Sequence, residues 1–295
     1  MFGPTEIITK RHGIIHHRSE GFSALLKDTE ARLKWLTHIP DDWAVVFVTG
    51  SGTLANEMVL ASWPFETTFY PDYGLFSERL EALHQTQPYK EGPQLHAYAG
   101  YETAESKLTY TPGMKGGTMS EGEFLFCDMI SGFPFYQPPT DCSIFTGVAF
   151  KQFRGTGGLS FIAASPGFVQ MVLGHSSNLS IISSLSLFGA LHHRIDGQTP
   201  HTPAMQQIAD FNDLLVDFNC DREAIQIAAR RDWIRHALPD GLEGIGEGPV
   251  FTFSSLPDWF MRNWGLYNNG GSPQAFLWNG QDRDYRDFCN AMRQL

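Results

Sequence analysis

Three features of this chain combine residue types that could do chemistry: a glycine turn, an aspartate and a lysine. The turn runs from Gly50 to Thr53, and Asp128 and Lys151 follow it along the chain. Backbone N–H groups in a turn that opens a helix can bind a phosphate, and the hydroxyls of Ser51 and Thr53 are further donors. A carboxylate such as Asp128 can keep a neighbouring ring nitrogen protonated. A lysine in apolar surroundings can form an imine with an aldehyde, because desolvation lowers its pKa.

Each feature alone also has an ordinary explanation. The glycine turn lacks both the Gly-Lys-Ser/Thr of a Walker loop and the spacing of a dinucleotide-binding loop, so it fits a simple tight turn. Asp128 fits a capping residue, and Lys151 fits a solvated surface lysine. Together, however, a phosphate-binding turn, an aspartate and a lysine are the groups needed to hold and use pyridoxal phosphate. Their combination predicts a vitamin B6 enzyme.

The elements around these residues predict an α/β sheet. Residues 43–48 form a short, continuous apolar run typical of a buried parallel strand, and the glycine turn ends it where a helix over 54–61 begins. A strand that runs through a glycine turn into a helix is half of a βαβ unit. Asp128 closes the apolar run 124–126, which places it at the carboxyl end of a strand, where ligands bind in open α/β sheets. Two further predicted strands are 142–145 and 159–164.

Helical spacing of apolar residues predicts a helix after Ser19 and a long helix over 203–218. The long helix is expected to lead from a large domain, residues 1–218, to a small C-terminal α+β domain, residues 219–295. The elements predicted in the small domain are a first helix, a loop at 239–248, strands near 250–253 and 274–278, and a final helix near 285–292.

Composition limits the class of protein. A chain of 295 residues with 42% hydrophobic and 18% charged residues is typical of a globular enzyme. The net charge of -11 argues against nucleic acid and anionic lipid as partners. The four cysteines and the paired histidines have no metal-ligand spacing, so no metal site is expected. Without a secretory start or a long apolar span, a cytoplasmic protein with reduced thiols is expected.

In order along the chain, these motifs resemble the class V aminotransferases of the pyridoxal-phosphate-dependent fold, and the branch of the phosphoserine aminotransferases most of all. The resemblance covers most of the chain. It rests also on Phe2-Gly3-Pro4-Thr5, the segment from His16 to Phe22, the segment from Gly74 to Arg79, Glu102-Thr103-Ala104 and His201-Thr202-Pro203.

The resemblance implies a role for each matched residue. Ser51, Gly52 and Thr53 hold the phosphate, assisted by Thr202 from a partner chain, which implies a homodimer with shared active sites. The roles implied at the ring are stacking by Phe76 and Ile130, contact of Thr103 with the phenolic oxygen, pairing of Asp128 with the ring nitrogen, and an imine at Lys151. Substrate binding is implied for His17 and Arg18, and for the position that Gln274 occupies.

The implied activity is transfer of an amino group between an amino acid and a 2-oxo acid. A pyridoxal-phosphate lyase or desulfurase on the same fold is an alternative, although no cysteine lies in an obvious glycine-rich loop. A binding protein that keeps the fold and has lost turnover is a second alternative.

The sequence departs from the family pattern at three places. The segment between Arg79 and Glu102 is short, in a region where relatives have a longer strand and helix. Phe150 stands before Lys151, where relatives usually carry a polar residue that contacts the phosphate. Gln274 replaces the arginine that clamps the substrate carboxylate, and glutamine cannot supply a charged fork. Arginines that could take over this role are Arg262, Arg18 and Arg11.

Overall fold

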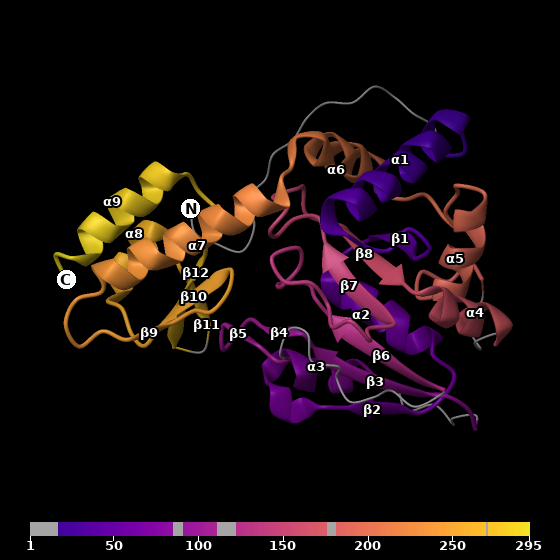
Figure 1. Ribbon diagram of the computed structural model, residues 1–295, viewed down its shortest axis with the longest axis horizontal. Coiled ribbons are helices and arrows are strands. Elements are labelled where there is room, and N and C mark those ends of the chain that lie inside the picture. Colours follow the sequence, from indigo (N-terminus) through magenta and orange to yellow (C-terminus); the bar gives the residue numbers. More distant parts are fainter. Residues whose placement is uncertain (1–16, 85–90, 111–121, 176–180, 270) are drawn as a thin grey trace.

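The computed structural model describes residues 17–84, 91–110, 122–175, 181–269 and 271–295. The motif at residues 2–5, His16 and the alternative carboxylate partner Arg11 lie outside these residues. A large sheet with helices on both faces occupies one side of the molecule, and a smaller C-terminal layer occupies the other (Figure 1).

The described residues form a six-stranded main sheet. Its strands, in spatial order, are β1 (Ala44–Thr49), β8 (Leu159–Ala164), β7 (Ile144–Val148), β6 (Glu123–Asp128), β3 (Gln94–Ala99) and β2 (Thr67–Phe69). Of these strands β8 alone runs opposite, because it pairs antiparallel with both β1 and β7. The mostly parallel mixed sheet flanked by helices confirms the predicted fold class.

Helices cover both faces of this sheet (Figure 1). One face packs against α2 (Gly52–Ser62), α4 (Pro166–Gly174) and α5 (Leu187–Ile195), and the other packs against α1 (Glu20–Thr37) and α6 (Met205–Asp217). Neighbouring strand residues point to opposite faces. Val46 and Phe126 therefore enter the apolar cluster below α2, whereas Val45 and Leu125 enter the cluster below α1. Two buried faces explain why the strands are continuous apolar runs.

The first helix begins where the sequence predicts. The Ser19 hydroxyl accepts a 3.2 Å hydrogen bond from the Phe22 N–H and so caps α1, which ends at His38 in the left-handed conformation. At the far edge, β2 leads through a 3-10 turn, η1 (Pro71–Tyr73), into α3 (Leu75–Leu83). The described residues between α3 and β3 contain no further strand, which fits the short segment predicted there.

The hairpin of β4 (Tyr101–Glu102) and β5 (Lys107–Leu108) follows β3. The C-terminal part then contains α7 (Cys220–Ala237), β9 (Gly244–Ile245), β10 (Val250–Phe253), α8 (Asp258–Trp264), β11 (Tyr267–Asn269), β12 (Ser272–Phe276) and α9 (Asp282–Met292). Its antiparallel sheet has the order β11-β12-β10-β9 and encloses its own apolar cluster around Trp278 and Phe288. The short β9 lies within the stretch predicted as a loop, because Ile245 pairs with Thr252 of β10. The predicted boundary at residue 218 falls between α6 and α7.

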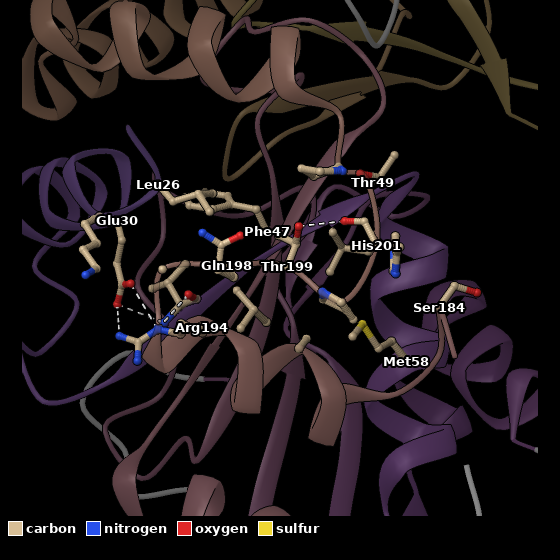
Figure 2. A pocket seen from close by; sticks show the side chains of 18 of the residues that line it. Leu26, Glu30, Phe47, Thr49, Met58, Ser184, Arg194, Gln198, Thr199 and His201 are labelled. Atoms are coloured by element: carbon tan, nitrogen blue, oxygen red, sulfur yellow. Dashed lines mark hydrogen bonds and ion pairs between the residues drawn. The ribbon is translucent and has the colours of Figure 1, made fainter. Parts of the chain in front are cut away.

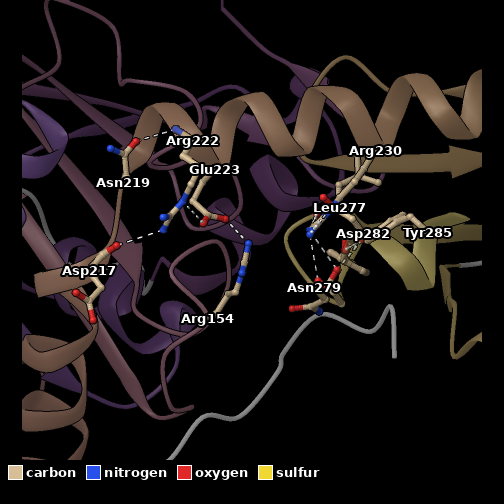
Figure 3. A network of polar contacts seen from close by, with 12 residues as sticks. Arg154, Asp217, Asn219, Arg222, Glu223, Arg230, Leu277, Asn279, Asp282 and Tyr285 are labelled. Carbon is tan, nitrogen blue, oxygen red and sulfur yellow. Dashed lines mark hydrogen bonds and ion pairs between the residues drawn. The ribbon is translucent and has the colours of Figure 1, made fainter.

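Helix α7 is bound near its start and again near its middle (Figure 3). Near its start, Glu223 forms an ion pair with Arg154, which lies in the turn that carries Lys151. Farther along, Arg230 donates a 2.8 Å hydrogen bond to the Leu277 carbonyl and lies over the Tyr285 ring at 4.7 Å. The helix therefore connects the lysine turn to the core of the C-terminal part.

None of the described helices is long and apolar enough to cross a membrane. The described residues also contain no group of three His, Cys, Asp or Glu side chains that could hold a metal ion.

Candidate active site

Eight of the predicted site residues line one cavity of about 210 Å³ where β6 and β7 end beside the start of α2. These residues are Ser51, Gly52, Thr53, Phe76, Thr103, Asp128, Ile130 and Lys151. They come from five separate segments, so the fold brings together groups that lie up to about a hundred residues apart in the sequence. Phe150 lines the cavity beside them, at the position where the sequence departs from the family.

The glycine turn presents free donors to this cavity. Gly50 has a φ of +148°, and a Cβ there would lie 2.5 Å from the Leu54 side chain, so the turn requires glycine. A Cβ on Gly52 would lie 2.4 Å from the Ile130 side chain, which packs directly against this glycine. The Ser51 hydroxyl caps α2 by accepting a 3.3 Å hydrogen bond from Leu54. The N–H groups of Gly52 and Thr53 make no hydrogen bond with the described residues, so they are open to an anion.

Asp128 is fixed by the strands and helix around it. One carboxylate oxygen accepts a 2.7 Å hydrogen bond from Asn56, and the other accepts a 2.9 Å bond from the Ile130 N–H. Asn56 in turn accepts a 2.6 Å bond from Thr146 on the neighbouring strand. Burial raises the pKa of Asp128, while the Ile130 N–H, Asn56 and the Lys151 charge oppose that rise. The carboxylate is therefore held rigidly at the cavity floor, with its orientation set by two donors.

Lys151 follows β7 in a tight turn and reaches back into the cavity. Its ammonium donates a 2.6 Å hydrogen bond to the hydroxyl of Ser131, which also lines the cavity. Burial lowers the pKa of Lys151 to about 8, and the nearby Asp128 carboxylate opposes part of that shift. At pH 7 about a tenth of such an amine is neutral, against about 0.03% of an ordinary lysine. Lys151 is thus a usable nucleophile near neutral pH.

The segments that carry Phe76 and Thr103 share one buried carboxylate. One oxygen of Glu102 accepts a 2.9 Å hydrogen bond from the N–H of Phe76 in α3. The other oxygen accepts a 2.9 Å bond from the N–H of Ala104, the residue after Thr103. Burial raises the pKa of Glu102, and these two N–H donors oppose the rise. Glu102 therefore positions both cofactor-facing segments, although the sequence motif alone assigned it no role.

Asn56 and Ser131 are site residues that the sequence reasoning missed. Asn56 is the single amide in the otherwise mostly apolar start of α2, one turn beyond the glycine turn, and that isolated polar residue was an available signal. Ser131 gave no signal in the sequence, because only the approach of Lys151 distinguishes it from any other serine that follows a strand.

Gln274 does not line the cavity. It is 1% exposed, and its amide donates to the carbonyls of Thr103 (2.8 Å) and Ala104 (3.2 Å) and to the Thr252 hydroxyl (3.0 Å). The Thr252 hydroxyl also lies 2.5 Å from that of Ser106. Gln274 thus joins β12 of the C-terminal part to the segment that carries Thr103. The amide nitrogen of Gln274 thus donates to three acceptors within the protein. Substrate binding by Gln274 stays a prediction.

His17, Arg18 and Thr202 also lie outside the lining of this cavity. Arg18 donates a 2.9 Å hydrogen bond to the Thr199 carbonyl. Thr199 lines a second, smaller cavity of about 60 Å³ (Figure 2). The segment 199–204 is attached to the main sheet by a 2.8 Å hydrogen bond from the Ala204 N–H to the Thr49 hydroxyl. Thr202 is exposed on this segment. It lies two residues before Ala204, which binds Thr49 at the end of β1, the strand that leads into the glycine turn.

Comparison with solved structures gives the class of fold. The chain has the fold of the pyridoxal-phosphate-dependent aminotransferases. It superposes on an aspartate aminotransferase of subgroup IV from Thermus thermophilus with a TM-score of 0.76 and 18% identity, over 99% of this chain and 97% of the other. A phosphoserine aminotransferase from Trichomonas vaginalis, solved with bound PLP, matches with a TM-score of 0.69 and 13% identity, over 95% and 90% of the two chains.

Among curated proteins, phosphoserine aminotransferase from Xylella fastidiosa (strain Temecula1 / ATCC 700964) is 38% identical over 77 residues. That match covers 25% of this chain and spans only 21% of the length of the relative. No protein-family model matches the chain. The resemblance to the class V aminotransferases is therefore confirmed at the level of the fold.

Proposed function

We propose that this protein is a pyridoxal-phosphate-dependent aminotransferase, similar to phosphoserine aminotransferase, that moves an amino group between an amino acid and a 2-oxo acid. One observation carries the proposal: Lys151 and Asp128 line the same cavity as the free N–H groups at the start of α2. A lysine with its pKa lowered to about 8, a fixed carboxylate and an open anion site are what this cofactor requires.

The donor set of the cavity fits pyridoxal phosphate. The phosphate would be held by the N–H groups of Gly52 and Thr53 and by the hydroxyls of Ser51 and Thr53, at the positive end of the α2 dipole. Apolar contact with the two faces of the ring would come from Phe76 and Ile130, and Thr103 would donate to the phenolic oxygen. When bound, the cofactor supplies an aldehyde and a ring that withdraws electrons from the substrate's α-carbon.

The protein's own residues then perform three tasks. Asp128 keeps the ring nitrogen protonated, because an adjacent carboxylate favours the cationic form. The neutral amine of Lys151 removes the proton from the substrate's α-carbon and holds it on Nζ, acting as general base. Phe76 and Ile130 keep water from the reacting atoms. A second substrate would follow the first in a ping-pong sequence.

The substrate's carboxylate needs a positive partner, and Arg79 is the candidate that the cavity offers. Among the described lining residues, Lys151 and Arg79 carry the positive charges. Arg79 is exposed and makes no hydrogen bond or ion pair with the described residues, whereas Gln274 is bound to the protein. We also propose that His17 and Arg18, although they lie outside the lining of this cavity, bind the distal group of the substrate.

We further propose a homodimer with shared active sites, in which Thr202 reaches the phosphate bound by the neighbouring subunit. The exposure of Thr202 outside its own cavity supports this arrangement. Residues 1–218 would form the large domain and residues 219–295 the small one. We also propose a cytoplasmic enzyme that acts on small molecules, and the charge of -11 argues against a nucleic-acid or anionic-membrane partner. Sedimentation should give twice the chain mass of 33.1 kDa, and a monomer would contradict the shared site.

The described cysteines favour transamination over desulfuration. A desulfurase needs a mobile, reactive cysteine, but none of the four cysteines lines the described cavity. Burial raises the pKa of both Cys220 and Cys289 to about 11, which keeps these thiols protonated. A binding protein without turnover is favoured by Phe150, which removes a phosphate donor, and it remains the second candidate.

The first experiment is the visible absorbance spectrum of the purified protein, followed by addition of phosphoserine, serine, alanine and glutamate. An imine band that bleaches with one of them supports the proposal. Lys151→Ala should fold normally and lose both the band and turnover. A wild-type protein that stays colourless with added pyridoxal phosphate would leave a binding protein on this fold. A Lys151→Ala variant with normal activity would overturn the mechanism.

A further inference from the structure

The amine of Lys151 has a defined partner in the cavity, the hydroxyl of Ser131. The two atoms lie 2.6 Å apart, and Ser131 is 4% exposed. Ser131 follows Asp128 by three residues, in the segment after β6. The Lys151 amine is therefore bound by the same short segment that carries Asp128. A buried hydroxyl that accepts a hydrogen bond from an ammonium fixes its position and favours its charged form.

Ser131 is itself held by the residue next to the lysine. The Gln152 amide donates a 2.6 Å hydrogen bond to the Ser131 carbonyl, and its oxygen accepts a 2.8 Å bond from the Phe135 N–H. Gln152 is 2% exposed. Two consecutive side chains, Lys151 and Gln152, therefore bind the two polar ends of one serine. This pairing fixes the segment 131–135 against the lysine turn.

The backbone that carries the lysine is fixed as well. Within this turn the Gly155 N–H donates a 2.7 Å bond to the Ala149 carbonyl, and the Arg154 N–H donates a 2.9 Å bond to the Lys151 carbonyl. A Cβ on Gly155 would lie 2.6 Å from the Ala149 carbonyl oxygen. The backbone of Lys151 and its terminal amine are thus both anchored, and only the methylene chain between them is left to change conformation.

We propose that Ser131 is a positioning residue for Lys151: its hydroxyl, held in place by Gln152, receives the lysine amine whenever that amine is not covalently engaged. The role rests on the proposed function, in which the amine must leave the cofactor and return to it in each half-reaction. A fixed resting place keeps the free amine within reach of the substrate's α-carbon, and no proton passes through Ser131.

The charged groups that face Lys151 set the background for a pH test. Among the described lining residues these are Asp128 from β6 and Arg79 from α3, with Glu102 of β4 behind Thr103. All three are unchanged by substitution of Ser131. A shift in the titration of Lys151 on removing the hydroxyl therefore reports the hydrogen bond itself.

The first measurement uses the apoprotein and no turnover. The rate of acetic anhydride labelling at Lys151, followed by mass spectrometry against pH, gives the titration midpoint of the amine. Ser131→Ala should lower that midpoint by about one pH unit, because the ammonium loses its acceptor. Ser131→Thr should retain the wild-type midpoint and Ser131→Val should not, since this pair differs only in the hydroxyl. Gln152→Leu should shift it in the same direction as Ser131→Ala.

The second measurement uses the loaded enzyme with the amino acid from the panel that bleaches its band. Ser131→Ala and Ser131→Val should lower kcat about 10-fold or more with KM changed less than twofold, and Ser131→Thr should recover most of the loss. Ser143→Ala is the control, because that hydroxyl accepts a 3.1 Å hydrogen bond from the Leu125 N–H in the first half of β6 and does not line the cavity. Circular dichroism confirms folding of each variant.

The outcomes separate the two proposals. The role of Ser131 would be overturned if both Ser131→Ala and Ser131→Val kept the wild-type labelling midpoint and a kcat within twofold of wild type. A wild-type protein that binds no pyridoxal phosphate would overturn the proposed function instead. Even then the labelling midpoint decides whether Ser131 holds Lys151.

Discussion

Asn56 on α2 and Asp128 at the end of β6 are joined by a 2.7 Å hydrogen bond, although 72 residues separate them in the chain. Asn56 also accepts a bond from Thr146, so helix and two strands meet at one amide. This bond aims the carboxylate at the cavity, and the glycine turn that opens α2 lies one helical turn away. The phosphate site and the ring-nitrogen site are thereby fixed to each other through α2.

Asn56→Leu should remove the hydrogen bond that orients the Asp128 carboxylate, while the side chain keeps a similar volume. Asp128 and Thr146 would each lose a buried partner, which costs about 1–3 kcal/mol of unfolding free energy. The affinity for pyridoxal phosphate should fall about 10-fold, measured by titration of cofactor absorbance. Asn212→Leu is the matched control, since Asn212 is a buried amide that binds Asp28 and Thr29 far from the cavity. Equal cofactor affinity in the two variants would contradict the role of Asn56.

The reactivity of Lys151 should depend on pH in the neutral range. Its lowered pKa of about 8 means that the folded protein gains neutral amine as the pH rises through 8. Binding of pyridoxal phosphate to the apoprotein should therefore speed up through that range and level off above it, followed by stopped-flow absorbance. In Asp128→Asn the midpoint should move lower, because the carboxylate raises the pKa of Lys151. A midpoint near 10.5 in the wild type would show that the amine is not desolvated.

Gln274→Leu separates a structural role from substrate binding. If the amide serves the Thr103 and Ala104 carbonyls, its loss leaves buried acceptors without partners and costs about 1–3 kcal/mol of stability in a denaturant titration. KM for the amino acid should change less than threefold. A KM raised 10-fold with stability unchanged would instead support the substrate role that the sequence predicted.

Gly74→Ala should disrupt the segment that carries Phe76. Gly74 has a φ of +126°, and a Cβ there would lie 2.5 Å from a carboxylate oxygen of Glu102. The methyl group would displace Glu102 from the N–H groups of Phe76 and Ala104, so a loss of about 1–3 kcal/mol is expected together with weaker cofactor binding. Gly157→Ala is the control, because no atom lies within 4 Å of a Cβ at that position and its φ is not positive. Thermal denaturation with and without cofactor measures both effects.

Arg79→Gln tests the assignment of the substrate carboxylate with two carbonyl reagents that differ by that group. Aminooxyacetate carries a carboxylate and methoxyamine does not, and both discharge the imine band. The variant should react with aminooxyacetate about 10-fold more slowly and with methoxyamine at the wild-type rate, since only the former loses a charged partner. If both rates stay unchanged, Arg79 does not bind the carboxylate. Weaker binding of pyridoxal phosphate alone would place Arg79 at the phosphate.

Local sequence determined the elements whose signal is short and continuous. The run 159–164 and the strand near 250–253 appear in the structure with the predicted bounds, because both are buried apolar runs between turn residues. Strand β3 was missed, since its polar His96 breaks the apolar pattern. The Nδ1 atom of His96 lies 2.8 Å from the Tyr70 hydroxyl, and its Nε2 lies 3.8 Å from a carboxylate oxygen of Glu123 on the neighbouring strand β6. Helix α5 was missed because serines interrupt the apolar run before it.

For the site, the sequence by itself determined which groups are available: the donors of the glycine turn, the strand-end carboxylate of Asp128 and the amine of Lys151. Their types and order carry that information without coordinates. The tertiary structure decided how these groups are held, through Asn56, Glu102 and Ser131. Each of these contacts joins segments that only the pairing of distant strands brings together, and each gains its strength from the burial that the assembled core provides.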